Sequence, residues 1–303
     1  MSAAETQAAN PAADGGTVLA FLNEVAGGRK LLAAIRERVE AGAGHVVLAA
    51  PQNVPSAGQI VDAEEIREAA LSRVEVTQKV LHDFGIESSA VVLDPDPLLA
   101  IDDAVRAFDP AEVLISCLPD SRYGWMRKDL IAWARDHFTV PVEHVPVRIE
   151  DDAVRWDVTH TLVVATQTVN APDLVRRLVQ RNSEHARRYT FICPRSGDAP
   201  REEVCDRLAS TLAAVYRQEI DATGQPMSPE PVAAVENAIE HYRVDDILIS
   251  TFAGRSSKWL EDGLIEEVRE FSNVEVEHFE SGGGSVESES EPATVGADAG
   301  GGS

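Results

Sequence analysis

Cysteine is scarce in this sequence, with three residues in a chain of 303. Cys117, Cys193 and Cys205 are odd in number, far apart in the chain and without a Cys-x-x-Cys pair. Neither a disulfide framework nor a zinc site is therefore predicted. We expect three buried free thiols and no metal site.

Long hydrophobic runs are also missing. No stretch of 18 or more apolar residues occurs, which is the length that a membrane-spanning helix needs. Residues 1–16 contain neither the basic segment nor the apolar segment of a secretory signal. We expect a soluble, cytoplasmic protein that does not contact a membrane.

Positive charge is in short supply. The chain has 27 basic and 51 acidic residues, a formal net charge of −24, which repels the phosphates of nucleic acids and anionic lipids, so we expect no nucleic-acid partner. Only four of the basic residues are lysines: Lys30, Lys79, Lys128 and Lys258. This acidic, lysine-poor composition fits either a protein adapted to concentrated salt or a GC-rich genome, and we favour salt adaptation.

The common catalytic motifs are absent as well. The sequence has no G-x-S-x-G elbow, no G-x-x-x-x-G-K-[ST] loop and no H-E-x-x-H helix, and its eight histidines form no pair at ligand spacing. We therefore predict no catalytic residue.

An internal repeat is present instead. Residues 95–145 align without a gap on residues 229–279, so that "EVLIS" matches "DILIS" and Trp125 matches Trp259. This offset of 134 becomes about 143 near the start of each copy, which makes the second copy about nine residues shorter in its middle. Two homologous domains are predicted, at 16–147 and 160–280, with a linker at 148–159 and disordered tails at 1–15 and 281–303.

Within each copy, short apolar runs alternate with amphipathic helical stretches. In the first copy the runs are 17–22, 45–50, 87–93, 111–116 and 141–147, and four of them recur in the second at 161–166, 188–193, 245–250 and 274–280. Continuous apolar strands between helices are typical of a parallel sheet covered on both faces. We predict two tandem Rossmann-like α/β domains with five-stranded parallel sheets. The third strand of the second copy is expected to be reduced or missing, because "DATGQPMSPEP" contains no β run.

The strand opening "VLAFLNE", the spacing to "DPDP" and the segment "VDDILISTFAGRSSKWLEDGLIEEV" together resemble universal stress protein domains in tandem. The resemblance implies the strand order 3-2-1-4-5 of the adenine-nucleotide alpha-hydrolase-like superfamily. It also implies an internal pseudo-dimer, which we expect to form through the fifth strands, "PVEHVPV" and "VEVEHFE".

ATP-binding members of that family carry Gly-x-x-Gly, nine residues, then Gly-Ser or Gly-Thr, where glycines let the backbone approach the phosphates. The second copy keeps Gly254, but Ser257 and Glu267-Val268 replace the later elements. The first copy has Asp120, Tyr123 and Trp133-Ala134 at these positions, so it is not expected to bind ATP.

The candidate binding residues therefore lie in the second copy. They are Gly254, Arg255, Ser256, Ser257 and Lys258, together with Thr166, which like Asn23 stands where the family places a carboxylate after strand one. An N-cap role for the serines is the alternative to anion binding. Trp125 and Trp259 are expected in the core rather than stacked on a base. The repeated Val-Glu-His of strand five is expected to be structural, because adjacent strand residues point to opposite faces.

These observations favour a non-catalytic stress-response or regulatory protein. It binds ATP or AMP weakly at most, or another small molecule or a protein partner. The alternative is a hydrolase or transferase of the same superfamily whose catalytic residues have been displaced.

Overall fold

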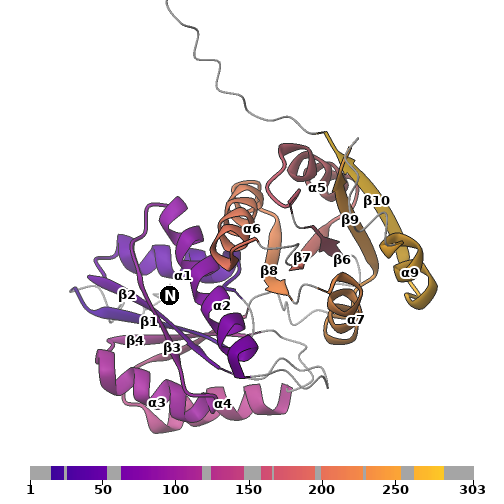
Figure 1. The fold of residues 1–303 in the computed structure, drawn as a ribbon. Coiled ribbons are helices and arrows are strands. Elements are labelled where there is room, and N and C mark those ends of the chain that lie inside the picture. Colours follow the sequence, from indigo (N-terminus) through magenta and orange to yellow (C-terminus); the bar gives the residue numbers. More distant parts are fainter. Residues whose placement is uncertain are drawn as a thin grey trace, which may run out of the picture.

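The structure is a computed structural model that describes residues 15–23, 26–52, 63–117, 124–146, 158–165, 167–194, 199–227, 230–253 and 263–282. Residues up to 146 are called the first half below, and residues from 158 the second half. Each half contains one parallel sheet with helices on both of its faces (Figure 1).

The first sheet has the order β3-β2-β1-β4-β5, with every neighbouring pair parallel. This confirms the predicted order 3-2-1-4-5. The elements of the first half are β1 (Thr17–Leu22), α1 (Arg29–Glu40), β2 (His45–Pro51), α2 (Ala63–Asp83), β3 (Ser89–Leu93), α3 (Pro97–Phe108), β4 (Glu112–Cys117), α4 (Gly124–His137) and β5 (Val142–Pro146).

The second sheet has the same order, β8-β7-β6-β9-β10, and is also parallel throughout. Its elements are β6 (Thr159–Val164), α5 (Pro172–Glu184), β7 (Arg187–Pro194), α6 (Arg201–Tyr216), β8 (Asp221–Met227), α7 (Pro231–His241), β9 (Asp246–Phe252), α9 (Leu264–Phe271) and β10 (Glu275–Ser281). The fold class predicted from the alternating pattern is thereby confirmed.

The ends of some helices follow directly from the sequence. Asp96 caps α3, where its carboxylate accepts the backbone N–H groups of Leu98 and Leu99, and Pro97 occupies the first helical turn. Proline suits that position because its missing N–H has no helical partner there. The central strands β1 and β4 are buried along almost their whole length, which is why they read as unbroken apolar runs.

Strand three of the second half is present, and the prediction that it is reduced or missing was wrong. β8 is seven residues long and pairs with β7 over its whole length. As an edge strand it tolerates Pro226, which has no N–H to donate to a ladder. The shortening of the second half is divided between helix two and the connection before it: α2 has 21 residues and α6 has 16, and 11 residues separate β2 from α2 whereas 6 separate β7 from α6.

Gly224 explains why this strand lacks a recognisable pattern. A Cβ atom on Gly224 would lie 2.8 Å from Cβ of Phe191 and 3.0 Å from Cδ1 of Leu208. The equivalent pair in the first half is Leu48 with Ala90, whereas here it is Phe191 with Gly224. The residue on the edge strand has lost its methyl group and its neighbour has grown from leucine to phenylalanine, so the pair keeps its volume without a side chain on β8.

This exchange of volume predicts a coupling between the two positions. Gly224→Ala should lower the free energy of unfolding by about 1–3 kcal/mol, because the new methyl group overpacks the site against Phe191 and Leu208. Adding Phe191→Leu, which restores the leucine and alanine pair of the first half, should cost less than the sum of the two single changes, by about 0.5 kcal/mol or more in urea unfolding. Strictly additive losses would contradict the volume exchange.

The two halves contact each other through α2, α6 and β8, which lie side by side (Figure 1). The expectation that the fifth strands form the contact was wrong. One hydrophobic cluster runs from the α1 and α2 side of the first sheet to the α5 and α6 side of the second, and it includes Val76 and Leu208. β5 and β10 instead pack mainly on their own sheets and on helices of their own half.

Polar contacts fix the register of this interface. The Arg29 Nε atom lies 2.8 Å from Asp221 Oδ1, and the Thr223 hydroxyl donates to the Ala26 carbonyl at 3.1 Å. Lys79 pairs with Asp206, and Arg201 pairs with Glu75. The edge strand β8 is thus covered by the other half, which shields it from pairing with another chain. A strand in this place could not be lost without exposing the interface.

Candidate functional site

The six residues predicted to bind an anion, Gly254, Arg255, Ser256, Ser257, Lys258 and Thr166, lie outside the described residues. The strand before the predicted turn, β9, and the helix after it, α9, are described. Glu267 stands in the first turn of α9 with an exposed side chain, and Val268 is buried on the same helix. Both residues that replace the family's Gly-Ser are therefore ordinary helical residues.

The corresponding end of the motif in the first half lies inside α4. Trp133 stacks on His137 at 4.4 Å between ring centroids and contacts the edge of Phe138, while Ala134 is buried. These side chains pack against the sheet and offer no phosphate contact. The side chains of Trp125 and Trp259 lie outside the described residues.

The Glu and His residues of the strand-five repeat point to opposite faces and have separate partners. Glu143 pairs with Arg38 of α1 at 2.5 Å, while His144 Nε2 lies 3.2 Å from Cys117 Sγ. In the second half Glu277 pairs with Arg177, and His278 Nε2 lies 2.8 Å from the Thr251 hydroxyl. An acid–base couple within one domain is excluded by this geometry.

The Cys117 and His144 contact is a candidate for thiol chemistry, because a thiol beside an imidazole can be activated. Cys117 is fully buried, however. The second half repeats the same contact with Thr251 in place of the cysteine. A hydrogen bond that works equally well with a threonine is structural.

All three cysteines are buried and free, as expected. Burial raises the pKa of the Cys205 thiol to about 11, with a further increase from Glu75 and an opposing effect of the hydrogen bond from Ser72. Burial also raises the pKa of Cys193. Neither thiol is activated.

A repeated ion network that the sequence analysis missed lies at the amino ends of the strands. Arg38 holds Glu112 with two parallel hydrogen bonds, of 3.1 Å from Nε and 2.9 Å from Nη2, and also contacts Glu143. Hydrogen bonds to Glu112 raise the pKa of Arg38 further, although burial opposes them. In the second half Arg181 contacts Asp246 at 2.8 Å and Glu277 at 3.4 Å.

The offsets of the internal repeat connect these two networks residue by residue. Arg38 and Arg181 are separated by the early offset, and the two acidic pairs by the later one. The recurrence of these charged residues in both copies could have revealed the network from the sequence. Because ligands of open parallel sheets bind at the carboxyl ends of the strands, this network at the amino ends reads as structural.

The carboxyl ends of the strands differ between the two halves. In the first half the Arg73 side chain, from α2, lies across the ends of β1 and β2. Its Nη1 atom lies 3.1 Å from the Leu22 carbonyl, 2.9 Å from the Asn23 carbonyl and 3.4 Å from the Pro51 carbonyl. The Asn23 N–H donates to the Ser116 carbonyl and joins the ends of β1 and β4. The carboxyl ends of the central strands of the first sheet are thus bonded to the Arg73 side chain and to the Asn23 backbone.

The second half keeps the same arginine with different contacts. Arg207 of α6 is the counterpart of Arg73, and the threonine one turn later recurs as Thr77 and Thr211. Both threonine hydroxyls donate to the carbonyl of their arginine. Arg207 Nη1 lies 3.4 Å from Glu203 Oε1, and its buried Nε and Nη2 atoms have no hydrogen-bond partner. At the switch point between β6 and β9, the Thr168 hydroxyl donates to the Ser250 carbonyl.

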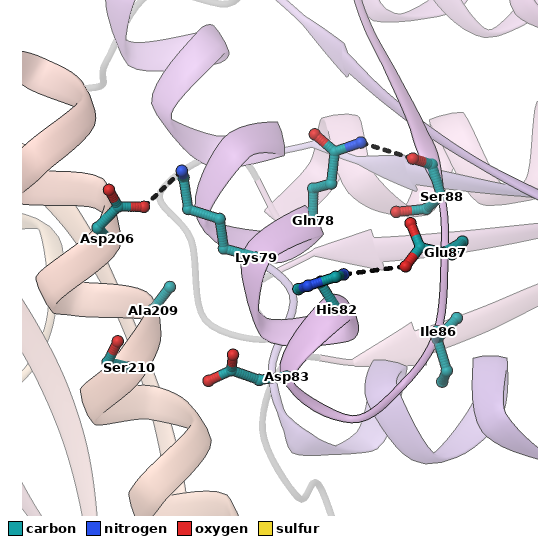
Figure 2. A pocket seen from close by; sticks show the side chains of 10 residues that line it. All are labelled: Gln78, Lys79, His82, Asp83, Ile86, Glu87, Ser88, Asp206, Ala209 and Ser210. Carbon is teal, nitrogen blue, oxygen red and sulfur yellow. Dashed lines mark hydrogen bonds and ion pairs between the residues drawn. The ribbon is translucent and has the colours of Figure 1, made fainter.

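A cavity of about 430 Å³ lies between α2 and α6 and contains none of the predicted site residues (Figure 2). Six of its polar lining residues are paired with one another: Lys79 contacts Asp206, His82 Nδ1 lies 3.0 Å from Glu87, and Gln78 donates to the Ser88 carbonyl. Burial lowers the pKa of Lys79, but the hydrogen bond to Asp206 and nearby carboxylates raise it overall. A wall in which Lys79 is already neutralised by Asp206 is typical of a hydrated gap in an interface.

No group of three or more His, Cys, Asp or Glu residues suited to a metal ion occurs among the residues that the structure describes. Within the same residues no helix has the length and apolar character to cross a membrane.

No protein-family model matches this chain, and no curated protein sequence matches it. Among solved structures, it is similar to a universal stress protein from Archaeoglobus fulgidus DSM 4304, with 16% identity and a TM-score of 0.36 over 90% of this chain and 99% of that one. It is also similar to a protein from Pseudomonas aeruginosa UCBPP-PA14 assigned to the same group, with 16% identity and a TM-score of 0.28 over 81% and 85% of the two chains. Both TM-scores are low, so the fold is established by the chain's own two sheets.

Proposed function

We propose that this chain is a non-catalytic regulatory protein of the cytoplasm that binds one small anionic ligand, a nucleotide such as ATP or AMP, in its second half. The observation that carries the proposal is the difference between the two carboxyl edges. Arg73 and its three carbonyl contacts fill the first edge. The second edge keeps an arginine, Arg207, whose buried Nε and Nη2 atoms have no hydrogen-bond partner.

The sequence supports the same assignment. Its resemblance to universal stress proteins implies a phosphate-binding turn that begins with Gly254, where Arg255 and Lys258 would supply positive charge. The counterpart of that turn in the first half contains Asp120, whose charge repels phosphate. One ligand per chain is therefore expected, and a stress-response role in a salt-adapted cell is consistent with the acidic composition.

Affinity is expected to be low. Ser257 and Glu267 replace the glycine and the Gly-Ser element of ATP-binding members. Each lost charge-assisted contact costs roughly 1.5–3 kcal/mol, so two losses weaken binding by about a hundredfold or more. Such a weak affinity suits a protein that senses a ligand present at high concentration.

Calorimetric titration tests the proposal. ATP should bind the wild-type protein at one site per chain, with less than half saturation at tens of micromolar and no hydrolysis over hours. Arg255→Ala should weaken binding further because it removes a charge next to the phosphates. The control is Arg106→Ala, since Arg106 is exposed on α3 of the first half and pairs only locally with Asp102.

Three results would contradict the proposal: tight stoichiometric binding, two sites per chain, or measurable turnover of ATP. Turnover would favour the hydrolase or transferase alternative.

A further inference from the structure

Arg207 carries a buried, unused edge of its guanidinium group. Its Nη1 atom lies 3.4 Å from Glu203 Oε1, which is a long and largely exposed contact, with 56% of the Glu203 side chain exposed. Its Nε and Nη2 atoms are buried without a hydrogen-bond partner. Buried polar groups in folded proteins are nearly always paired, and a buried charged donor without an acceptor is strongly unfavourable.

The two unpaired atoms are the ones that bind carboxylates and phosphates side by side. The Nε–H group and one Nη2–H group point in the same direction from one edge of the guanidinium plane, which matches two oxygens of one anion. This chain provides the example itself, because Arg38 uses the same two atoms to hold both oxygens of Glu112, at 3.1 and 2.9 Å. Arg207 presents that edge without a hydrogen-bond acceptor.

The counterpart of Arg207 in the first half, Arg73, uses its guanidinium group for contacts within the protein. Arg73 turns Nη1 toward three backbone carbonyls at the ends of β1 and β2. Arg207 sits at the same helical position, but its Nε and Nη2 atoms have no hydrogen-bond partner. The repeat therefore preserved the arginine and its threonine, whereas the second half leaves two of the arginine's donor atoms unpaired.

The backbone around Arg207 is fixed. The Thr211 hydroxyl donates to the Arg207 carbonyl and contacts the Val169 carbonyl before α5. Val169 lies in the connection that follows β6, so this part of α6 packs at the carboxyl end of the second sheet, where ligands of parallel α/β folds bind.

We infer that Arg207 binds an oxyanion, a phosphate or carboxylate group, through its Nε and Nη2 atoms at the carboxyl edge of the second sheet. The inference rests on the proposed function and deepens it, since it names the residue that holds the charged group of the ligand. It adds a site residue that lies outside the Gly254–Lys258 turn.

The test is thermal unfolding in sodium phosphate, sodium succinate and sodium chloride at equal ionic strength. Phosphate or succinate should raise the midpoint of the wild-type protein above its value in chloride, because a ligand that binds only the folded state stabilises it. The anion that raises the midpoint more shows whether the site prefers a phosphate or a carboxylate group. In Arg207→Met the apparent dissociation constant for that anion should rise at least about tenfold. Arg207→Lys, which keeps the charge without the two parallel donors, should lose much of the effect as well.

Arg73→Met is the matched control. It should lower the midpoint in chloride, because three carbonyls lose their donor, yet retain the full anion-dependent rise. Arg207→Met should not be less stable than wild type in chloride, because it removes unpaired buried donors. Equal anion effects in wild type and Arg207→Met, or no effect of either anion at 50 mM, would overturn the assignment.

The ATP titration separates this inference from the proposed function. If ATP binds wild type and Arg207→Met equally, Arg207 is not the contact and the proposed function stands. If ATP fails to bind but the Arg207-dependent effect of phosphate or succinate remains, the nucleotide is wrong and the oxyanion site stands.

Discussion

Asp246→Ala is expected to lower the free energy of unfolding by about 3–5 kcal/mol, the usual cost of leaving buried charges without their partner. The Asp246 carboxylate contacts Arg181 at 2.8 Å and Arg187 at 2.5 Å, and only 12% of its side chain is exposed. Without it, Arg181 retains only the longer contact to Glu277. Equilibrium unfolding in urea measures the loss.

Glu277→Ala is the matched control for this network. Its carboxylate is 27% exposed and its closest partner, Arg177, is itself 28% exposed, so we expect a loss of about 1 kcal/mol or less. The loss in Asp246→Ala should persist in high salt, because buried pairs are screened less than surface pairs. A value within 1 kcal/mol of wild type would mean that the network does not hold α5 to the sheet.

The elements that could be predicted from the sequence are those in which local pattern and burial agree. β1 matches the predicted strand at 17–22 end to end, and α3 (Pro97–Phe108) begins where the sequence offers a helix start. The first is an unbroken buried apolar run, and the second starts with a capping aspartate followed by proline. Local rules fix such segments regardless of what packs on them.

β8 could not be recognised for the opposite reason. Gly224 and Pro226 argue against a strand locally, but Phe191 on the neighbouring strand supplies the volume and the edge position tolerates the proline. The interface between the halves was also missed. Its contacts depend on α2 and α6 meeting in three dimensions, and no pattern within one helix reveals its partner.

The candidate site shows the same limit. The Gly254 turn could be predicted because its motif consists of residues that are close together in the sequence. The sequence offered no reason to notice Arg73 or Arg207, which are common residues on amphipathic helices. Their difference becomes visible only when hydrogen-bond partners are known, because one is paired with three carbonyls and the other is not. The sequence alone shows only that an arginine recurs at this position in both copies of the repeat.

The interface between α2 and α6 makes a second prediction of large effect. Cys205 of α6 is fully buried, and its thiol forms a hydrogen bond with Ser72 of α2 and lies near Glu75. Cys205→Asp places a carboxylate in this buried position close to Glu75, and the two cations that also act on it, Arg201 and Lys79, already pair with Glu75 and Asp206. We expect a loss of about 3–5 kcal/mol in the free energy of unfolding, whereas Cys205→Ser, which keeps a donor for Ser72, should lose about 1–2 kcal/mol.

Hydrogen exchange then shows where the damage occurs. If α6 packs on α2, amide exchange in Cys205→Asp should accelerate in α2 as well as in α6, although α2 belongs to the other half and to another sheet. β5 and β10 should keep their protection relative to the rest of their own sheets. Faster exchange confined to the second half would mean that the halves are not joined through these helices, and faster exchange at β5 would return the contact to the fifth strands.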